Sequence, residues 1–234
     1  MRFAFLIEPP FCFRDGANQP NGCDVQLANF VLERLNLSVD RVETEFADLL
    51  PGLDLGHWDV TTGLFVTKER QEIAAFSRPI WALADGLLVS KDISPTITGY
   101  TSVAEHGLRL AVIEDQVQHQ TALQLGVAHH SIVVCRTYLE AVQKVIKGHA
   151  DAYVSVARAH AGYLALNPSL SLKIVDVPAS EKPPAFGAFA FRLSDKELVQ
   201  RVDAVLSQYL GSAEHRSMMT NFGFSKTEID LVAT

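Results

Sequence analysis

The chain has 234 residues, of which 48% are hydrophobic, and its formal net charge at pH 7 is −7. This length allows one large domain or two lobes of about 100 residues each, with enough apolar residues to form a core. Nucleic acids and anionic membranes require a basic surface, so the acidic balance and the lack of any block of Lys or Arg exclude both as expected partners. No apolar run approaches the ~18 to 20 residues that a membrane helix needs.

The N-terminal stretch MRFAFLIEPP does not read as a signal peptide, because its apolar residues alternate and meet proline before any small-residue cleavage site. The chain is therefore either cytoplasmic or numbered from after a removed leader. The cysteines at 12, 23 and 135 lack the spacing of a metal site, and we expect no metal and no cofactor. Cys12 and Cys23 flank a turn-rich stretch, which leaves two alternatives: a disulfide between them, or buried free thiols.

The first part of the chain predicts alternating strands and helices. Strands are expected at 2–7, 42–46 and 58–65, and helices at 24–35 and 47–56. Asp24 can cap the first of these helices, and Thr67 can cap a short helix that begins with TKER.

The second part repeats the alternation. Strands are expected at 108–113, 131–135 and 151–156, and helices at 118–126, 137–148 and 194–211. Thr137 with Glu140, and Ser194 with Glu197, have the spacing of capping boxes. This alternation predicts an α/β architecture with largely parallel sheets.

The two parts of the chain also echo each other. LDLGHWDV and VIKGHADA both read as the end of a helix, Gly, His, one residue, Asp and a strand, with Gly at a turn that favours positive φ. We therefore expect two similarly built lobes. Lobe 1 is expected at 1–88 plus 191–234 and lobe 2 at 89–190, with a hinge of two apolar strands near 86–91 and 187–192.

Five stretches carry a resemblance that covers essentially the whole chain: EPPFCF, NGCDVQLA, LLPGLDLGHWDV, GLFVTKERQEIAAFSRPI and FAFRLSDKEL. In these the chain resembles the extracytoplasmic solute-binding proteins of ABC importers, in the family that binds polar amino acids. The resemblance implies the type II periplasmic-binding-protein fold, whose two lobes close on a ligand. It further implies a periplasmic monomer without catalytic residues that delivers its ligand to a membrane permease.

The resemblance also implies specific ligand residues. Arg70 of TKER would grip the ligand's carboxylate, because a guanidinium offers a fixed fork of donors that matches a carboxylate. EPPF and GLFVTKER are more narrowly similar to the binding proteins for ectoine and hydroxyectoine, which are zwitterions with a delocalised ring cation. That similarity implies that Glu8 faces the cation, with an aromatic cage around it and Gly63 beside it. The cage residues implied are Phe11, Phe46 and Phe65.

The chain departs from the family at three places. The interval from Asp59 to Thr67 is one residue shorter than usual, so the strand before Phe65 is expected to bulge or shift. Ser155 stands about where a general amino-acid binder carries the Asp that holds an α-ammonium. A Gly-rich turn of the second lobe is replaced by EDQV at 114–117, where either Gln116 or Gln118 could contact the ligand instead.

Three alternatives stay open at this point. The protein could bind a free amino acid, or it could be an enzyme similar to the cyclohexadienyl and arogenate dehydratases, with Glu8 as general acid. It could also be the sensor lobe of a larger receptor. Trp81 of SRPIWA could be a further wall of the cage, although a packing role is the favoured interpretation.

Overall fold

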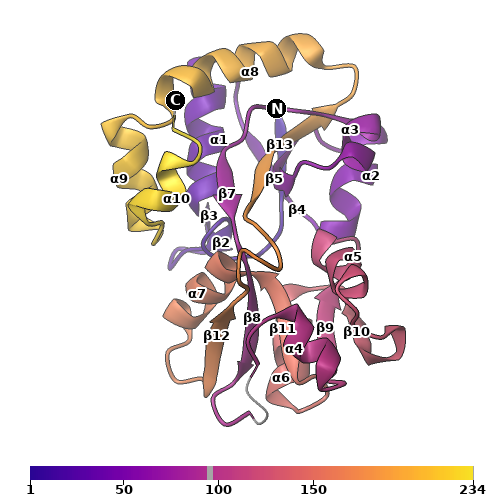
Figure 1. Ribbon diagram of the computed structural model, residues 1–234. Helices are drawn as coiled ribbons and strands as arrows, with labels where there is room; N and C mark the ends of the chain where they lie inside the picture. The colour runs from indigo at the N-terminus through magenta and orange to yellow at the C-terminus, as the bar shows by residue number, and fades with distance from the viewer. Residues whose placement is uncertain (94–96, 234) are drawn as a thin grey trace. The chain divides into compact units, whose positions relative to one another are not determined.

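The computed structural model describes residues 1–93 and 97–233. The chain forms two compact units (Figure 1): unit 1 consists of Met1–Ala82 and Ala185–Thr234, and unit 2 of Leu83–Pro184. The predicted lobe boundaries and the hinge near 86–91 and 187–192 stay predictions.

Unit 1 is built on a mixed sheet. Its strand order is β4 (Asp40–Glu43), β1 (Arg2–Phe5), β5 (Val60–Phe65), β13 (Ala185–Arg192) and β6 (Ala74–Phe76), and β7 (Trp81–Leu83) also pairs with β13. β1 runs parallel to β4 and β5, whereas β13 is antiparallel to β5 and β6. The helices are α1 (Cys23–Arg34), α2 (Leu49–Asp54), α3 (Lys68–Ile73), α8 (Lys196–Tyr209), α9 (Ala213–Asn221) and α10 (Lys226–Asp230). A 3-10 helix η1 (Phe46–Asp48) precedes α2, and β2 (Phe13–Arg14) pairs with β3 (Pro20–Asn21).

Unit 2 has a five-stranded sheet of similar design. Its order is β10 (Ile132–Cys135), β9 (Leu110–Ile113), β11 (Ala152–Val156), β8 (Asp85–Ser90) and β12 (Leu172–Asp176). β8 is antiparallel to both of its neighbours, while β9 is parallel to β10 and β11. The helices are α4 (Tyr100–Glu105), α5 (Val117–Gln124), η2 (His129–Ser131), α6 (Tyr138–Ile146) and α7 (Ala157–Leu166). The α/β class is thus confirmed, but the sheets are mixed rather than largely parallel, because β8 and β13 run against their neighbours.

Each unit has its own apolar core. In unit 2, Tyr100 of α4 belongs to one apolar cluster with Leu87 and Val112 of the sheet, and all three are fully buried. In unit 1, Trp58 packs with Leu49 of α2, and its indole N–H donates to the Leu49 carbonyl at 2.8 Å. No helix within 1–93 and 97–233 has the length and apolar character needed to cross a membrane.

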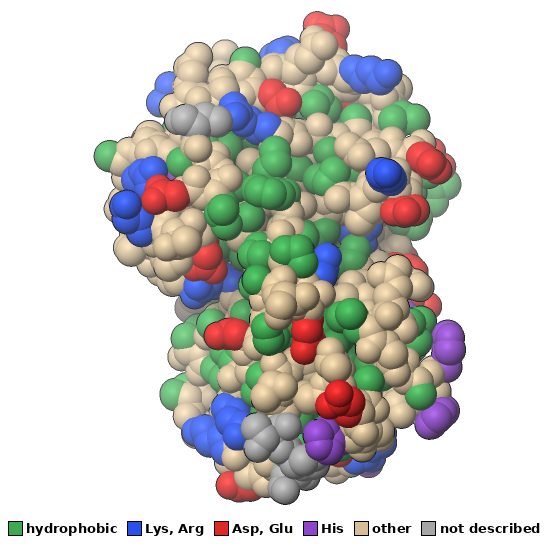
Figure 2. Space-filling view, in the orientation of Figure 1, with side chains coloured by type: hydrophobic (Ala, Val, Ile, Leu, Met, Phe, Trp, Pro, Cys, Tyr) green, Lys and Arg blue, Asp and Glu red, His purple; other side chains and the backbone are tan. Residues whose placement is uncertain are grey.

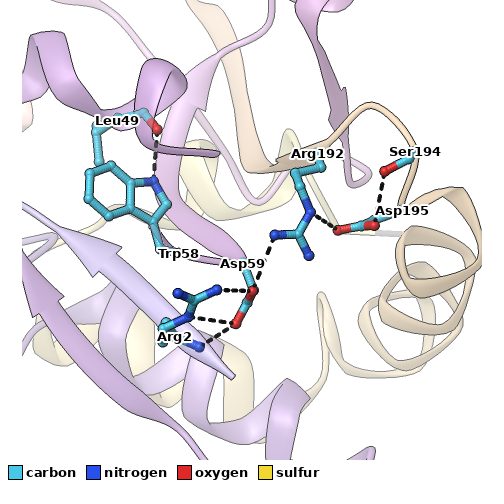
Figure 3. Close-up of polar contacts among 7 residues, drawn as sticks. All are labelled: Arg2, Leu49, Trp58, Asp59, Arg192, Ser194 and Asp195. Atoms are coloured by element: carbon cyan, nitrogen blue, oxygen red, sulfur yellow. Dashed lines mark hydrogen bonds and ion pairs between the residues drawn. The ribbon is translucent and has the colours of Figure 1, made fainter. Parts of the chain in front are cut away.

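The predicted echo between the two parts of the chain corresponds to a repeated corner (Figure 3 shows the copy in unit 1). The backbone N–H of Arg2 and its guanidinium Nη2 donate to the two carboxylate oxygens of Asp59, each at 2.8 Å. In unit 2, Arg109 makes the same pair of contacts to Asp151, again at 2.8 Å each. The turn glycines before the two aspartates, Gly56 and Gly148, have φ of 71° and 67°. The echo is therefore structural: each Asp ties the start of one strand to the start of its parallel neighbour.

Arg192 extends this corner in unit 1. Its Nη1 lies 3.4 Å from an Asp59 oxygen, and its Nε lies 3.1 Å from Asp195, next to the start of α8. Partial burial opposes ionisation of Asp59, but the hydrogen bonds and charge of Arg2, with the charge of Arg192, outweigh it and lower its pKa to about 2. The network therefore joins the ends of β1, β5 and β13 through one ionised carboxylate.

Two predicted helix caps are confirmed and two are wrong. The Thr67 and Thr137 hydroxyls accept from the N–H groups of Arg70 and Glu140, as capping requires. Asp24 does not cap α1, since it lies inside the first turn and turns its side chain into the core. The residue at the N-cap of α8 is Asp195 rather than Ser194.

A buried histidine predicts how stability depends on pH. His160 of α7 is fully buried, between the hydroxyl of Tyr138 at 2.7 Å and the carbonyl of Gly86 at 3.2 Å. Burial lowers the pKa of His160 from 6.5 to about 3. Between pH 6.5 and about 3, His160 is protonated in the unfolded chain but neutral in the folded chain. The free energy of unfolding therefore decreases as the pH falls below 6.5. The slope is about 1.36 kcal/mol per pH unit for one proton, or roughly 2 to 3 kcal/mol by pH 4.5.

Urea unfolding at pH 7.0, 5.5 and 4.5 measures this effect. His160→Gln keeps one donor and one acceptor, and we expect it to be less stable at pH 7 but to lose less stability on acidification. The pKa of His215 is also lowered, to about 4, and this residue is present in both proteins, so their difference isolates His160. Equal pH slopes in the two proteins would contradict the assignment.

Candidate ligand-binding site

The EPPF stretch forms a tight turn after β1. The N–H of Glu8 donates to the carbonyl of Cys12 at 2.8 Å, and the N–H groups of Phe11 and Cys12 return to the Glu8 carbonyl at 3.0 and 3.1 Å. The Glu8 side chain is half-buried, whereas Phe11 is buried. One hydrogen-bonded turn thus carries both the Glu8 carboxylate and the Phe11 ring.

The cysteines next to this turn are free and buried, which agrees with the second of the two predicted alternatives. Cys12 Sγ lies 3.4 Å from the hydroxyl of Thr62, and Cys23 Sγ donates to Asp24 at 3.6 Å. Burial raises the pKa of both thiols well above the ordinary value, which keeps them protonated.

Arg70 joins two of the predicted aromatic residues. It lies in α3, and its Nη1 donates to the carbonyl of Phe65 at 3.0 Å. Its guanidinium carbon also lies 5.5 Å from the ring centroid of Phe46, within the range of a cation–π contact. The Thr67 cap fixes the start of the helix that carries Arg70, so the guanidinium is held by its own helix, a strand carbonyl and a ring face.

Trp81 contacts two of the predicted aromatic residues, Phe65 and Phe11. Its ring lies 5.3 Å from that of Phe65 in an edge-to-face arrangement, and 5.7 Å from that of Phe11 at a tilt of 46°. Gly63 lies directly against the indole, since a Cβ there would come within 2.6 Å of it. The structure thus connects Phe11, Phe65, Arg70 and Phe46 by successive contacts within unit 1.

The predicted residues of the second lobe lie in unit 2. Gln116 is the N-cap residue of α5 and is only 6% exposed, and its side-chain oxygen finds no hydrogen-bond partner among the described residues. Gln118, the alternative, donates to Asp85 at 2.8 Å. Ser155 is buried in β11, where it pairs with Gly86.

The two backbone departures have structural counterparts. The pairing of β5 with β13 shifts register between Phe189 and Phe191, opposite Gly63 and Val60, in the strand where a bulge or shift was expected. In the turn that replaces the Gly-rich one, Asp115 takes a φ of 61°. Asp is one of the few residues other than glycine that adopt this left-handed conformation, so the turn can form here without a glycine.

Unit 1 also has an apolar groove of about 600 Å³ beside β6 and β13, in a part of the surface where Figure 2 shows hydrophobic side chains gathered. Phe76, Pro79, Phe186 and Leu193 supply its apolar lining, and Gln71 and Lys196 its polar lining. The described residues that line it include none of the predicted ligand residues, so this groove is a separate surface feature.

The profile of the bacterial extracellular solute-binding proteins, family 3, matches residues 1–223. The chain belongs to this family. The family consists of transport-associated solute-binding proteins rather than enzymes, as the resemblance implied.

Two relatives in this family match most of the chain. A probable amino-acid ABC transporter periplasmic-binding protein of Sinorhizobium fredii is 25% identical over 231 residues, covering 94% of this chain and 76% of that protein. A probable amino-acid ABC transporter-binding protein of Haemophilus influenzae is 25% identical over 198 residues, covering 84% and 74%. The histidine-binding periplasmic protein of Salmonella typhimurium is 29% identical over 112 residues, 47% of this chain and 41% of that protein.

Solved structures show the same fold. EhuB in complex with hydroxyectoine superposes with a TM-score of 0.87 at 22% identity, covering 100% of this chain and 93% of that one. An ancestral arginine-binding protein bound to glutamine gives a TM-score of 0.84 at 22% identity, covering 94% and 96%. The ancestral amino acid-binding protein AncCDT-1, a precursor of cyclohexadienyl dehydratase, gives 0.82 at 25% identity, covering 95% and 94%. The type II periplasmic-binding-protein fold is thereby confirmed.

Proposed function

We propose that this solute-binding protein captures a small zwitterion for an ABC importer, and that its ligand is ectoine, hydroxyectoine or a close relative. In this proposal it works as a periplasmic monomer and delivers the ligand to a membrane permease. The names of the curated relatives support the transport role. The choice of ligand rests on the residues of unit 1.

The observation that carries the proposal is the linked set of one guanidinium and aromatic rings. Arg70 lies over the face of Phe46 and is hydrogen-bonded to the backbone of Phe65, and Trp81 connects Phe65 to Phe11. A guanidinium binds a carboxylate through paired hydrogen bonds, and aromatic faces attract a cation with about 0.5 to 2 kcal/mol per contact. A zwitterion whose charges are a carboxylate and a flat cationic ring matches both.

Glu8 gives the proposal its selectivity. A delocalised ring cation with N–H groups can donate to a carboxylate, which a quaternary ammonium such as glycine betaine cannot do. Ser155 is neutral where a general amino-acid binder is expected to carry an Asp, so the α-ammonium of an amino acid loses its usual partner. Both features favour a cyclic zwitterion.

Gln116 is proposed as a ligand contact in unit 2. A buried acceptor left without a hydrogen bond costs about 1 to 3 kcal/mol, and its side-chain oxygen finds no partner among the described residues. A ligand N–H or hydroxyl that donates to this oxygen would remove that cost.

Calorimetric titration of the purified protein tests the ligand class. The panel is ectoine, hydroxyectoine, glycine betaine, arginine, glutamine and histidine, with thermal unfolding as a second readout. We expect micromolar or tighter binding of the cyclic solutes and at least about tenfold weaker binding of the others. A ligand at 100 times its Kd stabilises the folded state by about 2.7 kcal/mol.

Tighter binding of an amino acid than of either cyclic solute would replace the proposal with the second candidate, an amino-acid-binding protein, which the relatives' names favour. Incubation with prephenate and arogenate, followed by product analysis, tests the dehydratase alternative. We expect no turnover.

A further inference from the structure

Trp81 occupies a slot made by two glycines on neighbouring strands of unit 1. A Cβ at Gly63 of β5 would lie 2.6 Å from the indole, and one at Gly187 of β13 would lie 1.9 Å from it. Both distances are too short for any side chain, so the ring rests directly on the backbone of the two strands. Trp81 is 6% exposed, so its ring is buried within the unit.

The edge of this indole is held by a buried carboxylate. Trp81 Nε1 donates to Asp24 Oδ1 at 3.2 Å. Asp24 Oδ2 accepts from the Thr62 hydroxyl at 2.6 Å and from the N–H of Gly63 at 2.8 Å. Asp24 is 1% exposed, and all of these donors are neutral.

Such a carboxylate is expensive to bury, because charged groups strongly prefer water. Burial raises the pKa of Asp24 above its ordinary value, and the hydrogen bonds from Thr62, Gly63 and Trp81 oppose that rise. Through its hydrogen bonds to Gly63 of β5 and to Trp81, the Asp24 carboxylate holds both the strand under the indole and the indole itself.

The indole also meets two aromatic residues that are proposed to contact the ligand. Phe65 meets it edge to face and Phe11 meets it at a tilt, with centroids 5.3 and 5.7 Å away. An aromatic face attracts a cation only when the ring is correctly oriented. Trp81 contacts both Phe11 and Phe65, and Phe11 also meets Phe224 edge to face at 6.2 Å.

We propose that Trp81 and Asp24 are positioning residues of the binding site: Asp24 locks the indole in its glycine slot, and the indole sets the angles at which Phe11 and Phe65 meet the ligand's cation. This inference rests on the proposed function. It adds Asp24 and Trp81, which are 57 positions apart in the chain, as residues that determine ligand affinity without donating a hydrogen bond to the ligand.

The protein's two tryptophans supply a matched test. Trp58→Phe removes a buried indole that donates to the Leu49 carbonyl, and Trp81→Phe removes the indole that contacts Phe11 and Phe65. Affinity for hydroxyectoine is measured by calorimetry, and stability by urea unfolding. We expect both variants to lose stability, but only Trp81→Phe to bind about 5- to 20-fold more weakly. Trp58→Phe should stay within about twofold of the parent protein.

Fluorescence gives a readout that a purely structural role would not change. In the Trp58→Phe background all tryptophan emission comes from Trp81, and we expect saturating ligand to shift or quench it. Asp24→Asn in the same background should shift the emission to longer wavelength and weaken binding by a similar factor, because the amide cannot accept from both Gly63 and Trp81. If Asp24→Asn does not fold, Trp81→Phe alone decides the matter.

The outcomes separate the two proposals. Hydroxyectoine binding that is unchanged in Trp81→Phe, with Trp81 emission insensitive to ligand, overturns the positioning role and leaves the proposed function intact. A parent protein that binds glutamine or arginine instead, with a clear Trp81 response, overturns the proposed ligand and supports the positioning role. Equal losses of hydroxyectoine affinity in Trp58→Phe and Trp81→Phe show that only stability is involved, and they overturn the inference.

Discussion

Replacing Arg70 with lysine is expected to weaken binding of the zwitterionic ligand by about 100-fold or more. The guanidinium is held over Phe46 and against the Phe65 carbonyl, which fixes the plane of its fork of N–H donors. Lysine keeps the charge but presents a single ammonium, so it loses the paired hydrogen bonds to a carboxylate and the flat contact with the ring. Two charge-assisted hydrogen bonds of about 1.5 to 3 kcal/mol each make this loss large.

The matched control is Arg34→Lys. Arg34, in the last turn of α1, stacks over Phe30 at 5.0 Å, so the chain contains a second arginine–phenylalanine pair in the same unit. We expect Arg34→Lys to bind the ligand with the parent Kd in calorimetry. An Arg70→Lys protein that binds within about threefold of the parent would remove Arg70 from the site.

Replacing Glu8 with glutamine is expected to produce the second large effect, a loss of about 30-fold or more in affinity for ectoine and hydroxyectoine. The substitution preserves size and leaves the backbone turn intact, because that turn is closed by main-chain hydrogen bonds to Cys12. It removes the negative charge that we propose faces the ring cation. A charge-assisted hydrogen bond in a desolvated site is worth about 2 to 3 kcal/mol, which corresponds to this factor.

Glu43→Gln is the control for charge, because Glu43 pairs with Arg14 on the same unit and is not a proposed ligand residue. We expect it to leave the calorimetric Kd unchanged. Thermal unfolding without ligand should show that Glu8→Gln is folded. Ectoine binding with an unaltered Kd in Glu8→Gln would refute the cationic-ring assignment, and a simultaneous gain for glycine betaine would point to a simple aromatic pocket.

Half of the predicted helix caps and the repeated corner were predictable because they depend on residues close in sequence. Thr67 caps α3 through a residue three positions away, and the glycine before Asp59 or Asp151 marks its turn. The alternation of strands and helices likewise follows from local periodicity. The failed cap at Ser194 shows the limit, since a shift by one residue leaves the pattern almost unchanged.

Asp24 shows what local reasoning could not reach. In sequence it is an acidic residue at the start of a helix, where capping is the usual role. Its actual partners, Thr62 and Trp81, are far along the chain. A hydrogen bond between distant residues leaves no periodic trace in a single sequence.

The sequence alone therefore determined the α/β alternation, the two similarly built halves, and the family motifs that carry Glu8 and Arg70, because these are written in short-range spacing. Only the tertiary structure decided how Trp81 lies between Gly63 and Gly187 and what fixes it there. The missing Cβ atoms matter only once two strands are aligned and a ring from a third segment is laid across them. Packing of that kind requires three segments to meet in space. The contact of Phe11, in the EPPF stretch, with Trp81 therefore exists only in the folded chain.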